Sequence, residues 1–147
     1  MQFKDINIRD PFILLYDNRY YLYGTRGATA WTVASGLDVY VSDDLINWSE
    51  PIECFSVPSN FWADKEVWAP EVHLYNDTFY MFVSFRSDTH LRATQILKSD
   101  SPMGPFLPFT DGPITPEEWQ CLDGTFYVSK SRDPYIVFCR EWCQVTD

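Results

Sequence analysis

A hairpin pattern that occurs three times along this 147-residue chain constrains its fold more than any other feature. Each copy has an apolar run, a polar turn and a second run rich in aromatic and β-branched residues, which predicts two antiparallel strands. The copies begin at Asp10-Pro11, Ala69-Pro70 and Asp123-Gly124. Pro11 and Pro70 lie 59 positions apart, and Pro70 and Gly124 lie 54 apart. A β-sandwich has many short strands but does not repeat one hairpin at this interval, so the pattern indicates a repeat fold.

A second segment recurs between the hairpins, because Val39–Trp48 matches Ile96–Phe106. Two hairpins per unit make four strands, which is the content of one propeller blade. The blades are expected at about residues 8–55 and 67–110, with the first half of a third at about 121–145.

Since five such units need roughly 280 residues, we predict an all-β fold that is a partial five-bladed β-propeller, with about two and a half four-stranded blades in one domain over residues 1–147. We interpret the chain as truncated. An unfinished blade leaves strand edges unpaired, so self-association through the exposed blade edges is expected.

The net charge of the chain limits the classes of molecule that it is expected to bind. Aspartate and glutamate outnumber lysine and arginine by 21 to 11, and the formal net charge is -10 at pH 7. Nucleic-acid phosphates and anionic membrane surfaces need basic patches, so we expect neither as a partner. No apolar run reaches the roughly 20 residues of a spanning helix. A neutral polar partner fits better.

Two further features concern the cellular compartment. The first residues, Met1–Asp5, show no basic region followed by an apolar stretch, so no signal peptide is predicted. Cys54, Cys121, Cys139 and Cys143 form no Cys-x-x-Cys pair and lie far from both histidines. We therefore predict four reduced thiols, no zinc site and a cytoplasmic location.

Several segments, taken in order, resemble glycoside hydrolase family 43. The first blade carries an Arg-Asp-Pro-Phe start and a Ser-x-Asp-Leu-x-x-Trp type of signature, the second a Trp-Ala-Pro-acid motif, and the third a similar Asp-Gly start. These segments are Ile8–Ile13 with Tyr20–Thr25, Ser42–Trp48, Trp68–His73 with Phe79–Phe82, and Cys121–Tyr127. The resemblance runs along essentially the whole chain.

This resemblance implies a five-bladed propeller with its active site in an axial funnel, cleaving arabinose- or xylose-containing plant polysaccharides or oligosaccharides with inversion. Inversion needs one carboxylate to activate water and a protonated one to assist the leaving oxygen, and a further carboxylate tunes the pKa of the acid. By the resemblance, Asp10 is the general base and Asp123 the pKa modulator. Their equivalent repeat positions predict that both open onto one funnel, with Ala69 between them.

Four other residues are candidate substrate contacts. Glu71 could bind sugar hydroxyls or anchor its strand, and Arg9 could pair with an axial carboxylate or lie on the surface. Trp62 and Trp68 are candidate stacking platforms for sugars, although large aromatics are more often core and we favour core for Trp68. No metal ligand set and no cofactor are predicted. A cation on the propeller axis has no support from the residues present.

The chain departs from the family pattern at the general acid, a glutamate on a later blade. Glu117 and Glu118 precede the third blade in a loop, and Glu141 matches a structural position. We therefore predict a carbohydrate-active hydrolase whose catalytic set is incomplete in this chain. The alternative is a non-catalytic carbohydrate-binding or scaffold propeller fragment. An interaction propeller that reuses the fold is disfavoured by the acidic blade starts.

Overall fold

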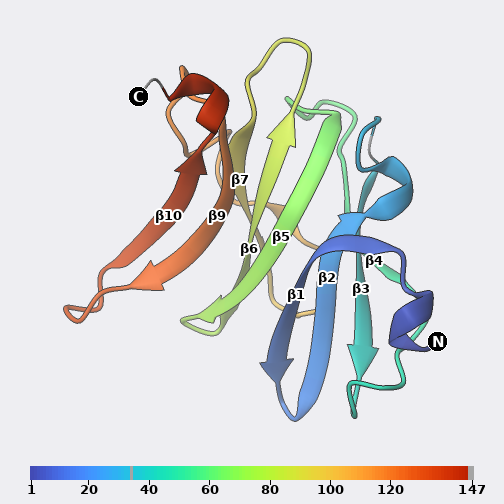
Figure 1. The fold of residues 1–147 in the computed structure, drawn as a ribbon. Helices are drawn as coiled ribbons and strands as arrows, with labels where there is room; N and C mark the ends of the chain where they lie inside the picture. Colours follow the sequence, from blue (N-terminus) through green and yellow to red (C-terminus); the bar gives the residue numbers. More distant parts are fainter. Residues whose placement is uncertain (34, 146–147) are drawn as a thin grey trace.

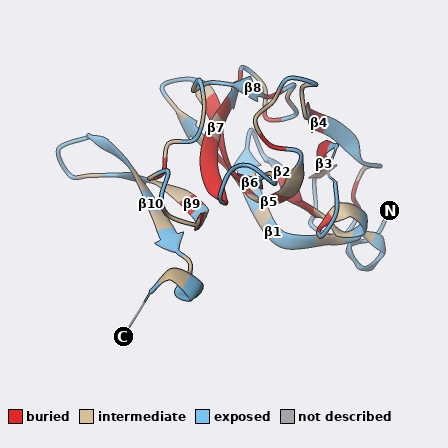
Figure 2. Ribbon diagram, turned by 90° about the horizontal axis from the view of Figure 1, so that it is seen from above, coloured by how far each residue is buried: buried red, intermediate tan, exposed pale blue. Residues whose placement is uncertain are grey.

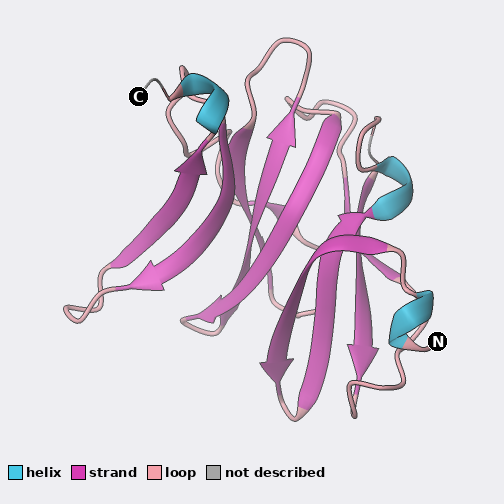
Figure 3. Cartoon of the chain, in the orientation of Figure 1, coloured by secondary structure: helices cyan, strands magenta, loops and turns pink. Residues whose placement is uncertain are grey.

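The computed structural model describes residues 1–33 and 35–145, and antiparallel strands make up most of its regular secondary structure (Figure 3). The strands form two four-stranded sheets and one two-stranded sheet, each in simple sequential order. The sheets stand side by side in chain order (Figure 1), with β5 next to β1 and β2, and β9 next to β5 and β6. This arrangement confirms the predicted all-β, partial propeller.

The first sheet contains β1 (Ile8–Tyr16), β2 (Arg19–Arg26), β3 (Gly36–Ser42) and β4 (Ile52–Ser56). The 3-10 helix η1 (Phe3–Asp5) precedes it, and η2 (Gly27–Thr29) follows β2. The second sheet contains β5 (Lys65–Tyr75), β6 (Thr78–Arg86), β7 (Ala93–Ser99) and β8 (Leu107–Pro108). The third contains β9 (Cys121–Val128) and β10 (Pro134–Arg140), followed by η3 (Trp142–Gln144). We refer to these sheets as blades one, two and three.

The inner hairpins of blades one and two turn in the same way. Asp17 and Asn18 have φ of 48° and 57°, and Asn76 and Asp77 have φ of 48° and 60°. Positive φ at both central residues defines the type I′ turn, whose twist matches that of the flanking strands and which Asn and Asp tolerate best. The recurrent polar pairs in the sequence therefore fix the register of both hairpins.

The main core lies between blades one and two (Figure 2). Tyr23 and Leu37 of blade one and Met81 and Leu97 of blade two are fully buried there. Blade three is far less covered, since Tyr127, Tyr135 and Val137 are each 54% exposed. In the described part of the chain, β10 has β9 as its single sheet neighbour. The predicted unpaired edge is thus present at β10.

The four cysteines are free thiols, two buried (Cys54 and Cys121) and two exposed (Cys139 and Cys143). Within residues 1–33 and 35–145, no helix has the length and apolar character needed to cross a bilayer.

Candidate active site

The first residue of each repeat has the same unusual backbone conformation. Asp10, Ala69 and Asp123 have φ of 49°, 47° and 53°, which L-residues rarely adopt. In each inner hairpin the strand register shifts at this point, between Arg9 and Phe12 in blade one and at the equivalent positions of the other two. A β-bulge of this kind redirects a side chain that a regular strand would point elsewhere. Because the same bulge occurs in each repeat, the side chains of Asp10, Ala69 and Asp123 leave their strands in equivalent ways.

These three residues line one pocket. Its volume is about 190 Å³, and its wall is formed by Arg9, Asp10, Trp31, Trp68, Ala69, Leu122 and Asp123. Asp10 and Asp123 both rank as exposed when the whole residue is considered, although the Asp123 carboxyl is partly buried. The structure therefore brings Asp10 and Asp123 together with Ala69, as their repeat positions predict.

Two buried hydroxyls join the blades behind the pocket. Thr25 of β2 donates a hydrogen bond of 2.9 Å to Oδ2 of Asp10 and accepts one of 2.9 Å from the backbone N–H of Ala69. Ser84, at the equivalent position of β6, accepts a 3.1 Å hydrogen bond from the backbone N–H of Asp123. Each bulged residue of blades two and three is thus tied to the preceding blade. Only in blade one does the hydroxyl also hold a carboxylate of the pocket.

The electrostatics of the pocket set Asp123 apart. Partial burial, followed by the negative charges of Asp10 and Glu71, raises the pKa of Asp123, while the positive charge of Arg92 opposes this rise. The pKa of Glu71 is lowered, chiefly by its hydrogen bond with His73, whose Nε2 lies 3.2 Å from Oε2 of Glu71. The carboxylates of Asp10 and Glu71 therefore lie near enough to Asp123 to repel its negative charge, and Arg92 offsets part of this repulsion.

One wall of the pocket is aromatic and cationic. The indole N–H of Trp68 donates to the carbonyl of Ala30, and the Arg92 guanidinium lies 4.2 Å from the centre of the Trp68 ring. Trp31 meets Trp68 edge-on at 4.9 Å and 76°, and Arg9 lies 5.0 Å from the Trp31 ring centre. Trp68 is half-buried and faces the pocket, so the expectation that it belongs to the core is wrong. The reason is its anchoring by Ala30, which turns the ring towards the blade starts.

Two predicted substrate contacts lie outside this pocket. Trp62 donates a 2.5 Å hydrogen bond to Oε1 of Gln95 and packs on Phe61 and Phe85, at the edge of the main core. It precedes β5 and lines a different depression, so the structure does not bring it together with Asp10 and Asp123. Glu71, two residues beyond Ala69, contacts His73 and does not line the pocket.

Sequence reasoning missed Trp31, Thr25 and Arg92. Trp31 lies in the segment between η2 and β3, which carries no repeat signal. Thr25 stands at the end of a recognised motif, and its 59-residue offset from Ser84 was a usable signal for a shared role. Arg92 is 8% exposed and pairs with Glu66 and Glu141, contacts that assemble only in the folded chain.

The other glutamates considered as acids lie elsewhere. Glu141 pairs with Arg92, and Glu117 lines a separate pocket near Leu91. Of the residues described, Asp10 and Asp123 are the carboxylates that line the pocket. No group of three or more His, Cys, Asp or Glu side chains in residues 1–33 and 35–145 is placed to hold a metal ion.

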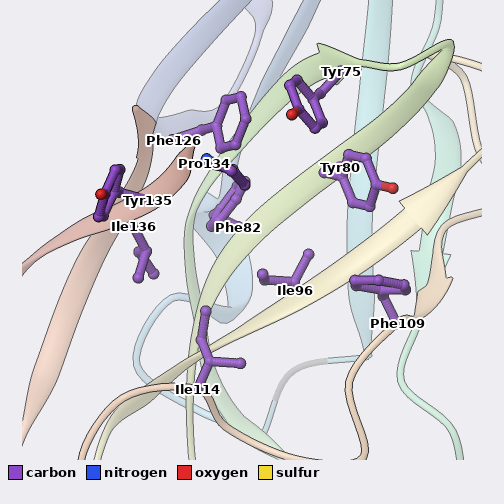
Figure 4. Close-up of a pocket in the computed structure, with 10 residues that line it drawn as sticks. All are labelled: Tyr75, Tyr80, Phe82, Ile96, Phe109, Ile114, Phe126, Pro134, Tyr135 and Ile136. Carbon is purple, nitrogen blue, oxygen red and sulfur yellow. The ribbon is translucent and has the colours of Figure 1, made fainter. Parts of the chain in front are cut away.

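A larger pocket of about 350 Å³ lies between blades two and three (Figure 4). Its wall is apolar and aromatic and contains no carboxylate: Tyr75, Tyr80, Phe82, Ile96, Phe109, Ile114, Phe126, Pro134, Tyr135 and Ile136. It lacks the acid groups that hydrolysis requires. The smaller pocket is therefore the candidate active site.

Known proteins with similar sequences and folds are carbohydrate-active enzymes. The structure of an endo-arabinase from Bacteroides thetaiotaomicron VPI-5482 matches 98% of this chain at 37% identity, with a TM-score of 0.87. An endo-1,4-beta-xylanase from the same organism matches 92% at 30% identity, with a TM-score of 0.72. The extracellular endo-alpha-(1->5)-L-arabinanase 1 of Bacillus subtilis (strain 168) is 27% identical over 86 residues, which are 54% of this chain.

The chain spans 49% and 43% of the two matched structures and 25% of the Bacillus relative. The Bacillus relative also contradicts the predicted cytoplasmic location, because its name states that it is extracellular. That prediction rested on the first residues and on reduced thiols. Neither observation decides export for a chain that matches only part of its relatives.

The decisive comparison concerns the family as a whole. The sequence model of the family described as "Glycosyl hydrolases family 43" matches residues 4–146, which is nearly the entire chain. The match includes all three blade starts and the two carboxylates of the pocket. It agrees with the fold similarity to the endo-arabinase. The chain belongs to glycosyl hydrolases family 43.

Proposed function

We propose that this chain carries the general-base half of an inverting glycosidase site that acts on arabinose-containing plant polysaccharides, with Asp10 as the general base and Asp123 as the pKa modulator. The observation that carries the proposal is the meeting of both carboxylates in one pocket, on equivalent bulges of the repeat. The family assignment supports it. The chain spans half of its matched relatives or less, so the complete protein's activity is part of this proposal.

The geometry suits Asp10 to the role of base. The Thr25 hydroxyl donates to Oδ2 of Asp10, which fixes the orientation of a carboxylate that lines the pocket. A base must stay ionised and exposed to the water that it activates, and Asp10 is exposed. The water would take its place between the carboxylate and the sugar ring, as inversion requires.

Asp123 suits a different role because it lies near the negative charges of Asp10 and Glu71. A carboxylate near a second acid raises the pKa of that acid and keeps it protonated as a proton donor. We infer that this acid lies outside the described residues, since Glu141 is paired with Arg92 and Glu117 faces another pocket. Losing a general acid slows such reactions by about 10²–10⁴-fold.

We favour arabinan as the substrate, with xylan second. Two relatives are named as arabinan-cleaving enzymes, and one of them is 37% identical to this chain. A xylanase is 30% identical. The competing function is carbohydrate binding without turnover, which the presence of only two carboxylates in the described pocket wall favours.

Hydrolysis of two substrates by the purified chain tests the proposal. A 4-nitrophenyl arabinofuranoside has a leaving group that needs little protonation, so the chain should cleave it slowly and with inversion, seen by NMR of the released anomer. Linear arabinan should be cleaved at least about 10²-fold more slowly than by a complete enzyme. Asp10→Asn should abolish cleavage of the aryl glycoside, whereas Asp111→Asn, at an exposed loop position, should not.

Three outcomes would contradict parts of the proposal. Full activity on arabinan that Asp10→Asn abolishes would show that the acid lies within this chain. Oligosaccharide binding without any cleavage of the aryl glycoside would favour the carbohydrate-binding alternative. Absence of both binding and cleavage would overturn the proposed substrate class.

A further inference from the structure

The size of the candidate active site limits what it holds. Its volume of about 190 Å³ lies below the roughly 300–1,000 Å³ of pockets that enclose a drug-sized ligand. A volume of this size suits a single sugar ring beside Asp10 and Asp123 better than an oligosaccharide. The remaining units of a polysaccharide must leave the pocket across its rim. Residues on that rim decide how a chain, as opposed to a single sugar, is held.

Trp31 occupies this rim. It lines the pocket, yet its side chain is 66% exposed, whereas Trp68 behind it is half-buried. An exposed indole loses the free energy that burial of a large apolar ring would supply. Trp31 is not among the residues of the main core between blades one and two, so packing of that core does not explain its position.

The ring of Trp31 is also held in place. Trp68 meets it edge-on at 4.9 Å, and the Arg9 guanidinium lies 5.0 Å from its centre. Trp68 is itself anchored by the Ala30 carbonyl and by Arg92 at 4.2 Å. Contacts of this kind reduce the conformational freedom that a side chain would otherwise lose on binding. Trp31 is therefore an exposed aromatic surface that is oriented before any ligand arrives.

We propose that Trp31 is the stacking platform for the sugar unit next to the one held by Asp10, so that it sets the preference of the site for oligosaccharides over single sugars. A sugar ring presents an apolar C–H face and a rim of hydroxyls. Because the Arg9 guanidinium lies over one face of the Trp31 ring, the C–H face of the sugar stacks on the other face. This assignment rests on the proposed function, because it takes the occupant of the pocket to be a carbohydrate.

Binding measurements on the full chain test this role. Calorimetry would compare linear α-1,5-arabinotetraose with free arabinose as the two probes. Trp31→Ala should weaken tetraose binding about fivefold, since one aromatic contact contributes on the order of 1 kcal/mol. Arabinose binding should change less than about twofold in this variant, because the Trp31 ring is assigned to the next sugar unit and not to the first. Trp31→Phe, which keeps an aromatic face, should recover most of the tetraose affinity.

Trp142 supplies the matched control. It is 85% exposed on η3 and does not line the pocket, so Trp142→Ala should bind both probes as the wild type does. Circular dichroism of each variant reports its fold, which an exposed position should leave intact.

The outcomes separate the two ideas. Wild-type tetraose binding that Trp31→Ala leaves unchanged would overturn the role of Trp31 and leave the proposed function standing. Equal losses for tetraose and arabinose would place Trp31 at the first sugar and overturn the assignment to the next one. A wild-type chain that binds neither probe would contradict the proposed function itself, and the role of Trp31 with it.

Discussion

Replacing Thr25 by valine tests whether one hydroxyl ties blades one and two together at the candidate active site. Thr25 is 1% exposed, and its hydroxyl donates to Asp10 and accepts from the Ala69 backbone N–H, both at 2.9 Å. Valine is β-branched like threonine and suits a strand, so the change removes the two hydrogen bonds while the side chain keeps nearly the same shape. The loss of stability therefore reports on the bonds.

The expected magnitude follows from the two partners. A buried N–H left without an acceptor costs about 1–3 kcal/mol, and a hydrogen bond to a charged group contributes about 1.5–3 kcal/mol. Because Asp10 is exposed and water can replace the hydroxyl there, the lower end applies to its bond. We expect Thr25→Val to lower the free energy of unfolding by about 2–4 kcal/mol. For a chain of this size the corresponding fall in Tm is roughly 5–12 °C.

Urea unfolding followed by circular dichroism measures this loss, with two control variants. Thr25→Ser keeps the hydroxyl and should lose less than about 1 kcal/mol. Ser84→Ala removes the equivalent hydroxyl of blade two, which has a single backbone donor at 3.1 Å, and should lose about 1–2 kcal/mol. Equal stability of Thr25→Val and Thr25→Ser would refute the reasoning, because it would mean that the hydroxyl holds nothing together.

Two further predictions concern charge and assembly. Burial, followed by the negative charges of Asp10 and Glu71, raises the pKa of Asp123 above its ordinary value of 3.8. The native state therefore binds the Asp123 proton more tightly than the unfolded chain does. As the pH rises above 3.8, the loss of this proton lowers the free energy of unfolding. Asp123→Asn should therefore resist urea better than the wild type at pH 7, by a margin that shrinks at acidic pH; a margin independent of pH would contradict this. Because β10 has an open outer edge in the described residues, the chain should self-associate at micromolar concentrations in sedimentation velocity, and a monomer throughout would disprove it.

The repeat in the sequence was enough to predict the architecture. Hairpins form from local alternation and turn residues, so Asp17-Asn18 and Asn76-Asp77 could be located without a structure. Equivalent residues of a repeat occupy equivalent places, which is why Asp10, Ala69 and Asp123 meet in one pocket. The family resemblance added roles that spacing alone does not contain.

The aromatic wall of the pocket depended on tertiary structure. Trp62 and Trp68 are only six positions apart in the sequence, yet one packs at the edge of the core and the other faces the pocket. Hydrogen-bond partners distant in sequence decide this, since Trp68 binds the Ala30 carbonyl and Trp62 binds Gln95. A composition rich in aromatics could not distinguish the two positions.

The sequence by itself determined the blades, their order and the two carboxylates, because these follow from a period that local strand and turn preferences impose. Only the tertiary structure decided which side chains surround those carboxylates. Trp31 reaches the rim from a segment outside the repeat, and Arg92 meets Glu66 across 26 residues of chain. Contacts of this kind depend on how one blade packs against the next, and that packing is a property of the folded chain and of no single repeat.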